Sequence, residues 1–284
     1  MQCHNKEEKK GGKDTVGQAD AGVLRSTAAH ESSWLGDEVT QSYDERYDRP
    51  GYYWGKNPSQ MCYRILQMLP PDRPLKLLDI GCGEGRNAIF FARNGYQVTA
   101  FDTSPKGVEK TKQLAADAGV SVETFVADIN DFRLTTPFDV LFSTGVLQYV
   151  LPGRRDDLFA NYRQWTNPGG VNAFSVFVRK PFIGEAPDGE KTARKWISGE
   201  LLTYYRDWRI EFCTEEIFNC MSSGVPHQHA VNRVIARKEA SQQSATGDTD
   251  KPCARASRWT NRAASVKSCM HNGRLRPDTH RSEQ

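Results

Sequence analysis

The chain has 284 residues, 38% of them hydrophobic, and its mean hydropathy of −0.66 is low for a compact enzyme. The net charge is +3, but residues 240–284 hold eight Lys/Arg and four Asp/Glu, so residues 1–239 carry a net charge of −1 and do not require a nucleic-acid partner. Seven cysteines without a Cys-x-x-Cys pair argue against a disulfide framework and against a zinc site.

Both ends of the chain have a composition that predicts disorder. Residues 1–33 are rich in Lys, Glu, Gly, Ala and Ser, and the basic tail 239–284 shows no periodicity. The N-terminus lacks the apolar stretch of a signal peptide, and no segment approaches the ~20 apolar residues of a membrane helix. We therefore expect a cytoplasmic protein with one folded domain at residues 34–238.

Within this domain, strands and helices alternate. An aromatic cluster at residues 34–55 precedes a helix predicted at 58–69, and later helices are predicted at 86–94, 105–118, 156–165 and 200–205. Strands are predicted at 75–80, 97–101, 120–126, 138–143, 171–178, 209–214 and 231–236, with a turn at 167–170. This order predicts an α/β fold: a Rossmann-like, doubly wound, mostly parallel seven-stranded sheet with a C-terminal antiparallel hairpin.

The turn after the first predicted strand indicates the kind of ligand. It contains Asp79, Gly81, Gly83 and Gly85, and Asp102 ends the next strand about twenty residues on, where a carboxylate takes both hydroxyls of a ribose. A dinucleotide site would have Gly-x-Gly-x-x-Gly and a pyrophosphate at the helix N-terminus. Here the turn is one residue tighter, and Asp79 would repel a pyrophosphate but accept a hydrogen bond from an ammonium group. The pattern favours S-adenosylmethionine, which carries an ammonium and no phosphate.

Several segments also resemble a known enzyme family. The glycine turn is similar to the first motif of class I S-adenosylmethionine-dependent methyltransferases. Residues 53–55, 78–87, 94–96, 167–170, 200–208 and 222–232 resemble the TehB-type tellurite-resistance methyltransferases. The resemblance covers about residues 43–238. It implies a small class I enzyme that methylates a small acceptor, with tellurite and selenite oxyanions as the family's named substrates.

The glycine turn and its flanking residues are expected to hold the methionine part of the cofactor. Asp79 would orient the ammonium group, and Arg86 with Asn87 opens a helix whose N-terminus favours the cofactor carboxylate. A solvated surface charge is the alternative for Arg86, and a small packed side chain is the alternative for Cys82. A tight strand-to-helix turn without a ligand is the alternative for the whole motif.

Further residues are expected to bind the nucleoside and the sulfonium. Asp128 would accept the adenine N–H while Ile129 packs on the ring, unless Asp128 caps a turn instead. Trp54 would form a lid, because aromatic faces attract cations, although such residues also serve in cores. The predicted cofactor-binding residues are Tyr53, Trp54, Asp79, Gly81, Cys82, Gly83, Gly85, Arg86, Asn87, Asp102, Thr103, Asp128, Ile129, Ser143 and Thr144.

Two histidines provide candidates for the acceptor site. His227 and His229 lie within the predicted domain, in a loop expected between the last two strands. With Arg179 and Arg233 they form the predicted catalytic set, which would hold an anionic acceptor or remove a proton from it. Two histidines at alternate positions can bind a metal ion, but we expect no third ligand near them and therefore no metal. Ordinary surface histidines are the remaining interpretation.

Three functions remain open from the sequence. The first is methyl transfer to a chalcogen oxyanion, the second is methyl transfer to a thiol or other small metabolite, and the third is a cofactor-binding domain that has lost turnover. We expect a small-molecule acceptor, no nucleic-acid or membrane partner, and a monomer or homodimer.

Overall fold

The computed structural model describes residues 33–186, 195–221 and 224–240. These residues belong to the first of two units into which the chain divides, residues 1–242. The predicted disorder of residues 1–33 and 239–284 falls almost wholly outside the described residues. Within the described part, no helix is both long enough and apolar enough to cross a membrane.

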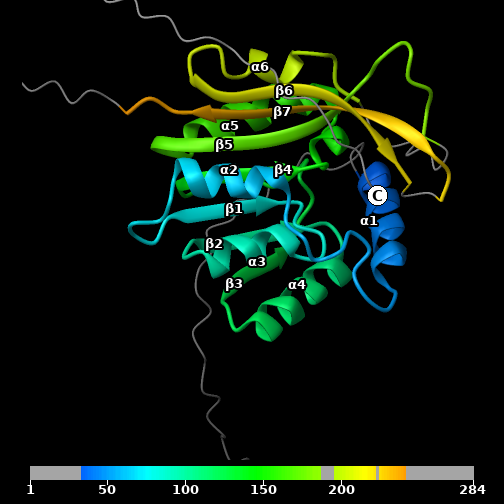
Figure 1. Cartoon of the computed structure of the whole chain (residues 1–284), viewed down its shortest axis with the longest axis horizontal. Helices are drawn as coiled ribbons and strands as arrows, with labels where there is room; N and C mark the ends of the chain where they lie inside the picture. The colour runs from blue at the N-terminus through cyan, green and yellow to red at the C-terminus, as the bar shows by residue number, and fades with distance from the viewer. Residues whose placement is uncertain (1–32, 187–194, 222–223, 241–284) are drawn as a thin grey trace, which may run out of the picture. The chain divides into compact units, whose positions relative to one another are not determined.

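Seven strands form one sheet in the order β3-β2-β1-β4-β5-β7-β6 (Figure 1). β7 pairs antiparallel with β5 and with β6, whereas the other neighbours are parallel. The doubly wound sheet and its C-terminal hairpin are therefore confirmed. The strands are β1 (Lys76–Ile80), β2 (Gln97–Asp102), β3 (Val122–Val126), β4 (Phe138–Thr144), β5 (Thr166–Val178), β6 (Arg209–Cys220) and β7 (His227–Arg237).

Local capping signals mark both ends of the helix that follows β2. Ser104 caps the helix that follows β2, accepting a hydrogen bond from the Gly107 N–H, and Gly119 ends that helix with φ +65°. The α-helices are α1 (Ser33–Tyr47), α2 (Gln60–Met68), α3 (Arg86–Arg93), α4 (Pro105–Ala118), α5 (Arg155–Gln164) and α6 (Glu200–Thr203). Two short 3₁₀ helices, η1 (Leu147–Tyr149) and η2 (Pro152–Arg154), follow β4.

The sheet has an apolar core on each face. Leu77 and Phe142 belong to the core that includes α2 and α3, whereas their neighbours Leu78 and Leu141 belong to the core that includes α5 and α6. Strand side chains alternate between faces, so a mostly parallel sheet buried on both sides needs apolar residues at successive positions. Figure 1 shows α2, α3 and α4 in front of the sheet and α5 behind β5.

The structure differs from the sequence predictions at three places. Residues 167–170, predicted as a turn, lie inside β5, where the pairing with β4 shifts register between Phe138 and Val140. β6 and β7 are longer than predicted, so His227 and His229 lie at the start of a strand and not in a loop. α1 was not predicted, because aromatic residues separated by polar ones give its sequence no clear helical stripe.

Candidate active site

A single cavity of about 1300 Å³ joins the loop after β1 to the β6–β7 hairpin. It opens at the carboxyl ends of the parallel strands, where ligands bind in open α/β sheets. In Figure 1, α1 stands beside these strand ends. Side chains from α1, from the loops after β1, β2, β3 and β4, and from the ends of β5, β6 and β7 line the cavity.

The loop Gly81–Gly85, here called the cofactor loop, brings its backbone close to the cavity. The Cys82 N–H donates to the Phe101 carbonyl at 2.9 Å, which ties the loop to β2. Gly83 has φ +55°, and a Cβ there would lie 2.9 Å from Tyr47 Oη. Gly83 therefore leaves room for Tyr47, which packs directly against the backbone of the cofactor loop.

Asp102 ends β2 beside this loop and lines the cavity. Its Oδ2 accepts the Gly83 N–H at 2.8 Å and its Oδ1 accepts the Ser104 N–H at 2.9 Å. Burial raises the pKa of this carboxyl to about 6, although both backbone donors favour the charged form. Each carboxylate oxygen keeps a second lone pair, so the group can still accept hydrogen bonds from a diol.

Asp79 lies deeper, at the end of β1. It is 1% exposed and is not among the described residues that line the cavity. Its Oδ2 is buried without a hydrogen-bond partner among the described residues, and burial together with the charge of Asp102 raises its pKa to about 7. A buried carboxylate oxygen without a donor is costly, and an ammonium group would satisfy it. The residues here therefore fit a ligand that is cationic at this point.

Arg86 and Asn87 begin α3 in different environments. Arg86 lines the cavity, and its Nη1 donates to the Trp54 carbonyl at 3.1 Å. Asn87 also lines it but is 4% exposed, and its Oδ1 accepts the Ser59 N–H at 2.9 Å while Nδ2 donates to Thr144 Oγ1 at 3.3 Å. Asn87 therefore joins the start of α2 to the end of β4, and Arg86 is the better candidate to hold a ligand carboxylate.

Most of the residues that the sequence predicts to bind the nucleoside line the cavity near the ends of β2, β3 and β4. Asp128 and Ile129 line it, but Asp128 Oδ1 accepts the Asn130 N–H at 2.8 Å. Oδ1 of Asp128 therefore caps a turn, as the alternative interpretation held, and Oδ2 is the oxygen that could accept a ligand N–H. Thr103 and Thr144 also line the cavity, whereas Ser143 is fully buried and donates to the Ile80 carbonyl at 2.9 Å.

Helix α1 supplies cavity residues that sequence reasoning missed. Tyr43 and Tyr47 line the cavity, and Tyr47 is 3% exposed against the cofactor loop. Asp44 accepts hydrogen bonds from the Ser104 hydroxyl and, at 3.2 Å, from the Lys106 N–H at the start of α4. The sequence predicted a lid at Trp54 from this aromatic cluster, but it did not predict the contact of Tyr47 with the cofactor loop.

Trp54 and Tyr53 behave differently although they are adjacent. Trp54 lines the cavity, is 40% exposed, and its Nε1–H donates to Tyr47 Oη at 3.2 Å. Tyr53 is not among the described residues that line it; its ring packs against Trp54 and lies 4.9 Å from the Arg49 guanidinium carbon. This geometry supports a lid role for Trp54 rather than for Tyr53.

We expect Trp54→Ala to weaken S-adenosylmethionine binding by about 2- to 30-fold, because an aromatic face contributes about 0.5–2 kcal/mol to the binding of a cation. Trp54→Phe keeps a ring but loses the Nε1–H that donates to Tyr47, so its loss should be smaller. Calorimetric titration of both variants would test the lid. Unchanged affinity in Trp54→Ala would show that Trp54 only holds α1 in place, through its hydrogen bond to Tyr47.

The other end of the cavity gathers the predicted acceptor residues. Arg179, His229 and Arg233 line the cavity, and His227 lies beside His229 with 2.9 Å between their Nε2 atoms. Arg233 also donates to Glu216 at 2.6 Å, but a guanidinium has further N–H groups for an anion. Cationic side chains outnumber carboxylates along the cavity; the cations are Arg46, Arg86, Arg155, Arg179, Lys180, Lys195 and Arg233.

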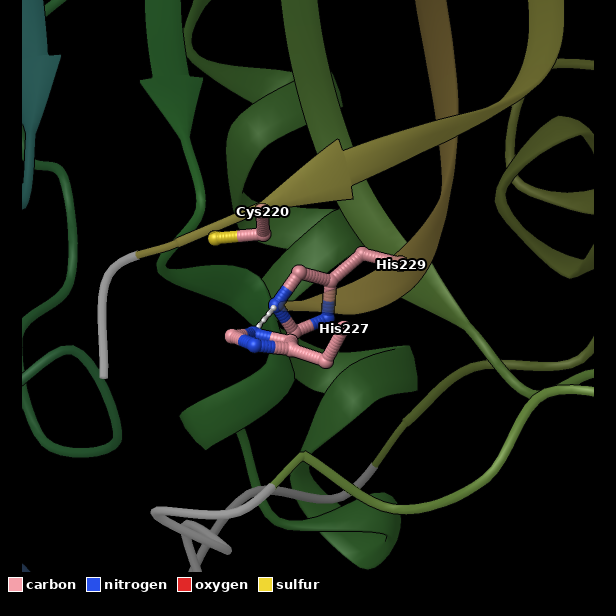
Figure 2. A group of neighbouring side chains, drawn as sticks. All are labelled: Cys220, His227 and His229. Atoms are coloured by element: carbon pink, nitrogen blue, oxygen red, sulfur yellow. Dashed lines mark hydrogen bonds between the residues drawn. The ribbon is translucent and has the colours of Figure 1, made fainter. Parts of the chain in front are cut away.

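The expectation that no third metal ligand lies near the histidines is wrong. Cys220 ends β6 directly opposite His227 in the hairpin, and its sulfur lies within 4.8 Å of ligand atoms of both histidines. Figure 2 shows the three side chains grouped at the end of the hairpin. Sequence reasoning missed Cys220 because the register of β6 against β7 decides which residues meet.

Comparisons with known proteins identify the family of this chain. The family model of the tellurite resistance protein TehB matches residues 61–223, which is more than half of the chain. "Probable S-adenosyl-L-methionine-dependent methyltransferase TehB" from Haemophilus influenzae is 28% identical over 137 residues, 48% of this chain and 47% of that protein. "Hemagglutinin 1" from Eikenella corrodens is 29% identical over 196 residues, 68% of this chain and 64% of that protein. The chain thus spans about half to two thirds of the length of these relatives.

A solved structure has the same fold. The crystal structure of TehB from Haemophilus influenzae matches with a TM-score of 0.57 at 21% identity, covering 70% of this chain and 67% of that chain. The alternation of strands and helices, the glycine-rich turn after β1 and the carboxylate at the end of β2 are the features on which the sequence prediction rested. The chain belongs to the TehB family, and its described residues have the fold of class I S-adenosylmethionine-dependent methyltransferases.

Proposed function

We propose that this protein transfers a methyl group from S-adenosylmethionine to a small anionic acceptor, with tellurite- and selenite-type oxyanions as the first candidates. The observation that carries the proposal is one cavity with two chemically different ends. The cofactor loop and Asp102 line one end, and His229 and Arg233 line the other. A cofactor and an anion bound at these ends would share a space closed over by α1.

The cofactor end recognises charge at separate points. Asp79 would accept the ammonium group, Asp102 the ribose hydroxyls, and Arg86 the carboxylate. When bound, S-adenosylmethionine supplies an electrophilic methyl group on a sulfonium that leaves as a neutral thioether. Trp54 and Tyr47 would exclude water, and the main contribution of the protein is alignment of the two reactants.

The acceptor end needs no strong base for a soft anion. Arg179, Arg233 and the histidine pair would position the oxyanion by charge and hydrogen bonds. For a thiol acceptor, a neutral histidine could instead remove the proton. Arg179 and the remaining N–H groups of Arg233 at this end of the cavity support an anion over a neutral acceptor.

The acceptor is identified by direct assay. Transfer of labelled methyl from S-adenosylmethionine to tellurite, selenite and small thiols separates oxyanion methylation, thiol methylation and an inactive cofactor-binding domain. A labelled methylated oxyanion formed from tellurite or selenite would support the first. Labelled thioether from thiols alone would favour the second, and cofactor binding without any transfer would favour the third.

The remaining features of the proposal follow from the sequence. We propose one domain at residues 34–238, a cytoplasmic location, and a monomer or homodimer that acts on small molecules without nucleic-acid or membrane partners. The near-neutral charge of residues 1–239 supports the absence of a nucleic-acid partner.

The histidine pair provides a test of the acceptor end. The double variant His227→Ala, His229→Ala should lower kcat/KM for the acceptor by about 10- to 100-fold, the loss of one or two charge-assisted hydrogen bonds. The dissociation constant for S-adenosylmethionine should not change, and calorimetry would check it. An unchanged kcat/KM would make both histidines bystanders.

A further inference from the structure

The β6–β7 hairpin brings together three side chains that suit a metal ion. In an antiparallel pair, residues directly opposite each other lie on the same face of the sheet, and so do residues two apart in one strand. Cys220 pairs with His227, and His229 is two residues further along β7. Their ligand atoms, one from each side chain, all lie within 4.8 Å of one another.

We propose that Cys220, His227 and His229 form a three-ligand site for a divalent transition-metal ion of the zinc class. One thiolate and two imidazoles are ligands that zinc prefers, and three protein ligands with an open fourth position are typical of catalytic rather than structural zinc. Tetrahedral zinc with bonds of about 2.0–2.3 Å holds its ligand atoms roughly 3.5 Å apart. Small side-chain rotations would bring the three atoms from within 4.8 Å to this spacing.

The surroundings of the histidines orient them for a metal. His227 Nδ1 lies 2.8 Å from the Val225 carbonyl oxygen, which can only accept, so Nδ1 carries the proton and Nε2, which faces His229 Nε2, is the nitrogen that would bind a metal ion. The His229 ring stacks on Phe177, with 4.8 Å between centroids, and lies 5.6 Å from Phe218. Figure 2 shows the hydrogen bond that joins the two imidazoles, which a metal ion bound to both would replace.

The open position of this site would face the cavity. Cys220 and His229 line the same cavity as the cofactor loop, together with Arg233. A bound zinc ion would attract an anionic oxygen there and would lower the pKa of a bound thiol. Anchoring the acceptor in this way rests on the proposed function, whereas metal binding itself does not.

Metal binding is tested on the full chain without any acceptor. Cys3, Cys253 and Cys269 are replaced by serine to remove thiols outside the described residues. This protein, stripped with a chelator, is titrated with Co²⁺ and with Zn²⁺. We expect one equivalent to bind, a thiolate-to-cobalt charge-transfer band, and an X-ray absorption first shell with one sulfur and two imidazole nitrogens. Absence of the band or of the sulfur would overturn the site.

Two further variants in the same background assign the ligand. Cys220→Ser should lose the charge-transfer band, whereas Cys213→Ser, which alters an exposed thiol on the same strand, should keep it. Retention of the band in Cys220→Ser would overturn the site. S-adenosylmethionine binding reports whether Cys220→Ser is folded; if it is not, the X-ray absorption of the background protein decides.

The acceptor role is measured separately. Zinc-loaded protein should have a KM for the acceptor at least tenfold lower than stripped protein, with the same dissociation constant for S-adenosylmethionine. An equal KM in zinc-loaded and stripped protein would show that the metal ion does not anchor the acceptor, but it would not contradict metal binding. Absence of methyl transfer to any acceptor, with cobalt binding intact, would contradict the proposed function and not the metal site.

Discussion

Asp79→Asn should weaken S-adenosylmethionine binding by about 10- to 150-fold, the equivalent of a charge-assisted hydrogen bond of about 1.5–3 kcal/mol. Asp79 is 1% exposed, and its Oδ2 is buried without a donor among the described residues. Asparagine preserves the shape of the side chain and removes the charge that an ammonium group requires. Isothermal titration calorimetry at pH 8 measures the loss, and unchanged affinity would exclude Asp79 from the cofactor site.

The same substitution should stabilise the cofactor-free protein. Burial, with the charge of Asp102, raises the pKa of Asp79 from 3.8 to about 7. Between these values the folded protein holds more protons than the unfolded chain, so its stability falls as the pH rises toward about 7. Asp79→Asn avoids this loss, and its free energy of unfolding at pH 8 should exceed that of the wild type by about 1–3 kcal/mol.

The pH dependence separates these effects from a general change in structure. The stability advantage of Asp79→Asn should shrink toward pH 4, where the wild-type carboxyl is protonated in both states. Cofactor affinity of the wild type should fall about tenfold between pH 8 and pH 6 as Asp79 takes up a proton, with less change in the variant. Asp102, whose pKa is raised to about 6, titrates in both proteins. A variant less stable than the wild type at pH 8 would contradict the unfavourable burial of this charge.

Local sequence signals predicted the half of the site that depends on one strand–turn–helix unit. The cofactor loop needs only the buried strand before it, three glycines and the start of α3, all within about ten residues. The position of Asp102 could be predicted as well, because β2 is the next strand in the chain and pairs in parallel with β1, so that both strands end at the same edge of the sheet. These features are set by short-range patterns that the sequence displays directly.

The rest of the site depends on contacts between distant segments. Tyr47 meets Gly83 because α1 packs over the strand ends, and nothing local specifies that packing. Cys220 meets His227 because the hairpin has one register out of several possible ones. Ser143 was predicted at the cavity, but its side chain donates to the Ile80 carbonyl, and the twist and pairing of β1 and β4 decide that orientation.

Gly85→Ala should cost about 2–5 kcal/mol of folding free energy and abolish measurable cofactor binding. Gly85 has φ +90°, which costs an alanine about 1–2 kcal/mol. A Cβ there would lie 2.8 Å from Thr111 Cγ2 and 3.0 Å from Thr111 Cα, and such overpacking adds about 1–3 kcal/mol. Thr111 cannot turn away freely, because its Oγ1 donates to the Gly83 carbonyl at 3.0 Å.

Gly119→Ala is the matched control for this substitution. Gly119 has φ +65°, and a Cβ there would meet no atom within 4 Å, so only the backbone cost of about 1–2 kcal/mol should appear in urea unfolding. Adding Thr111→Ser to Gly85→Ala removes Cγ2 and keeps the hydroxyl, so it should recover part of the lost stability, measured as a double-mutant cycle. Equal losses in the two glycine variants would show that the cofactor loop has room for a side chain, and that its third glycine serves the turn alone.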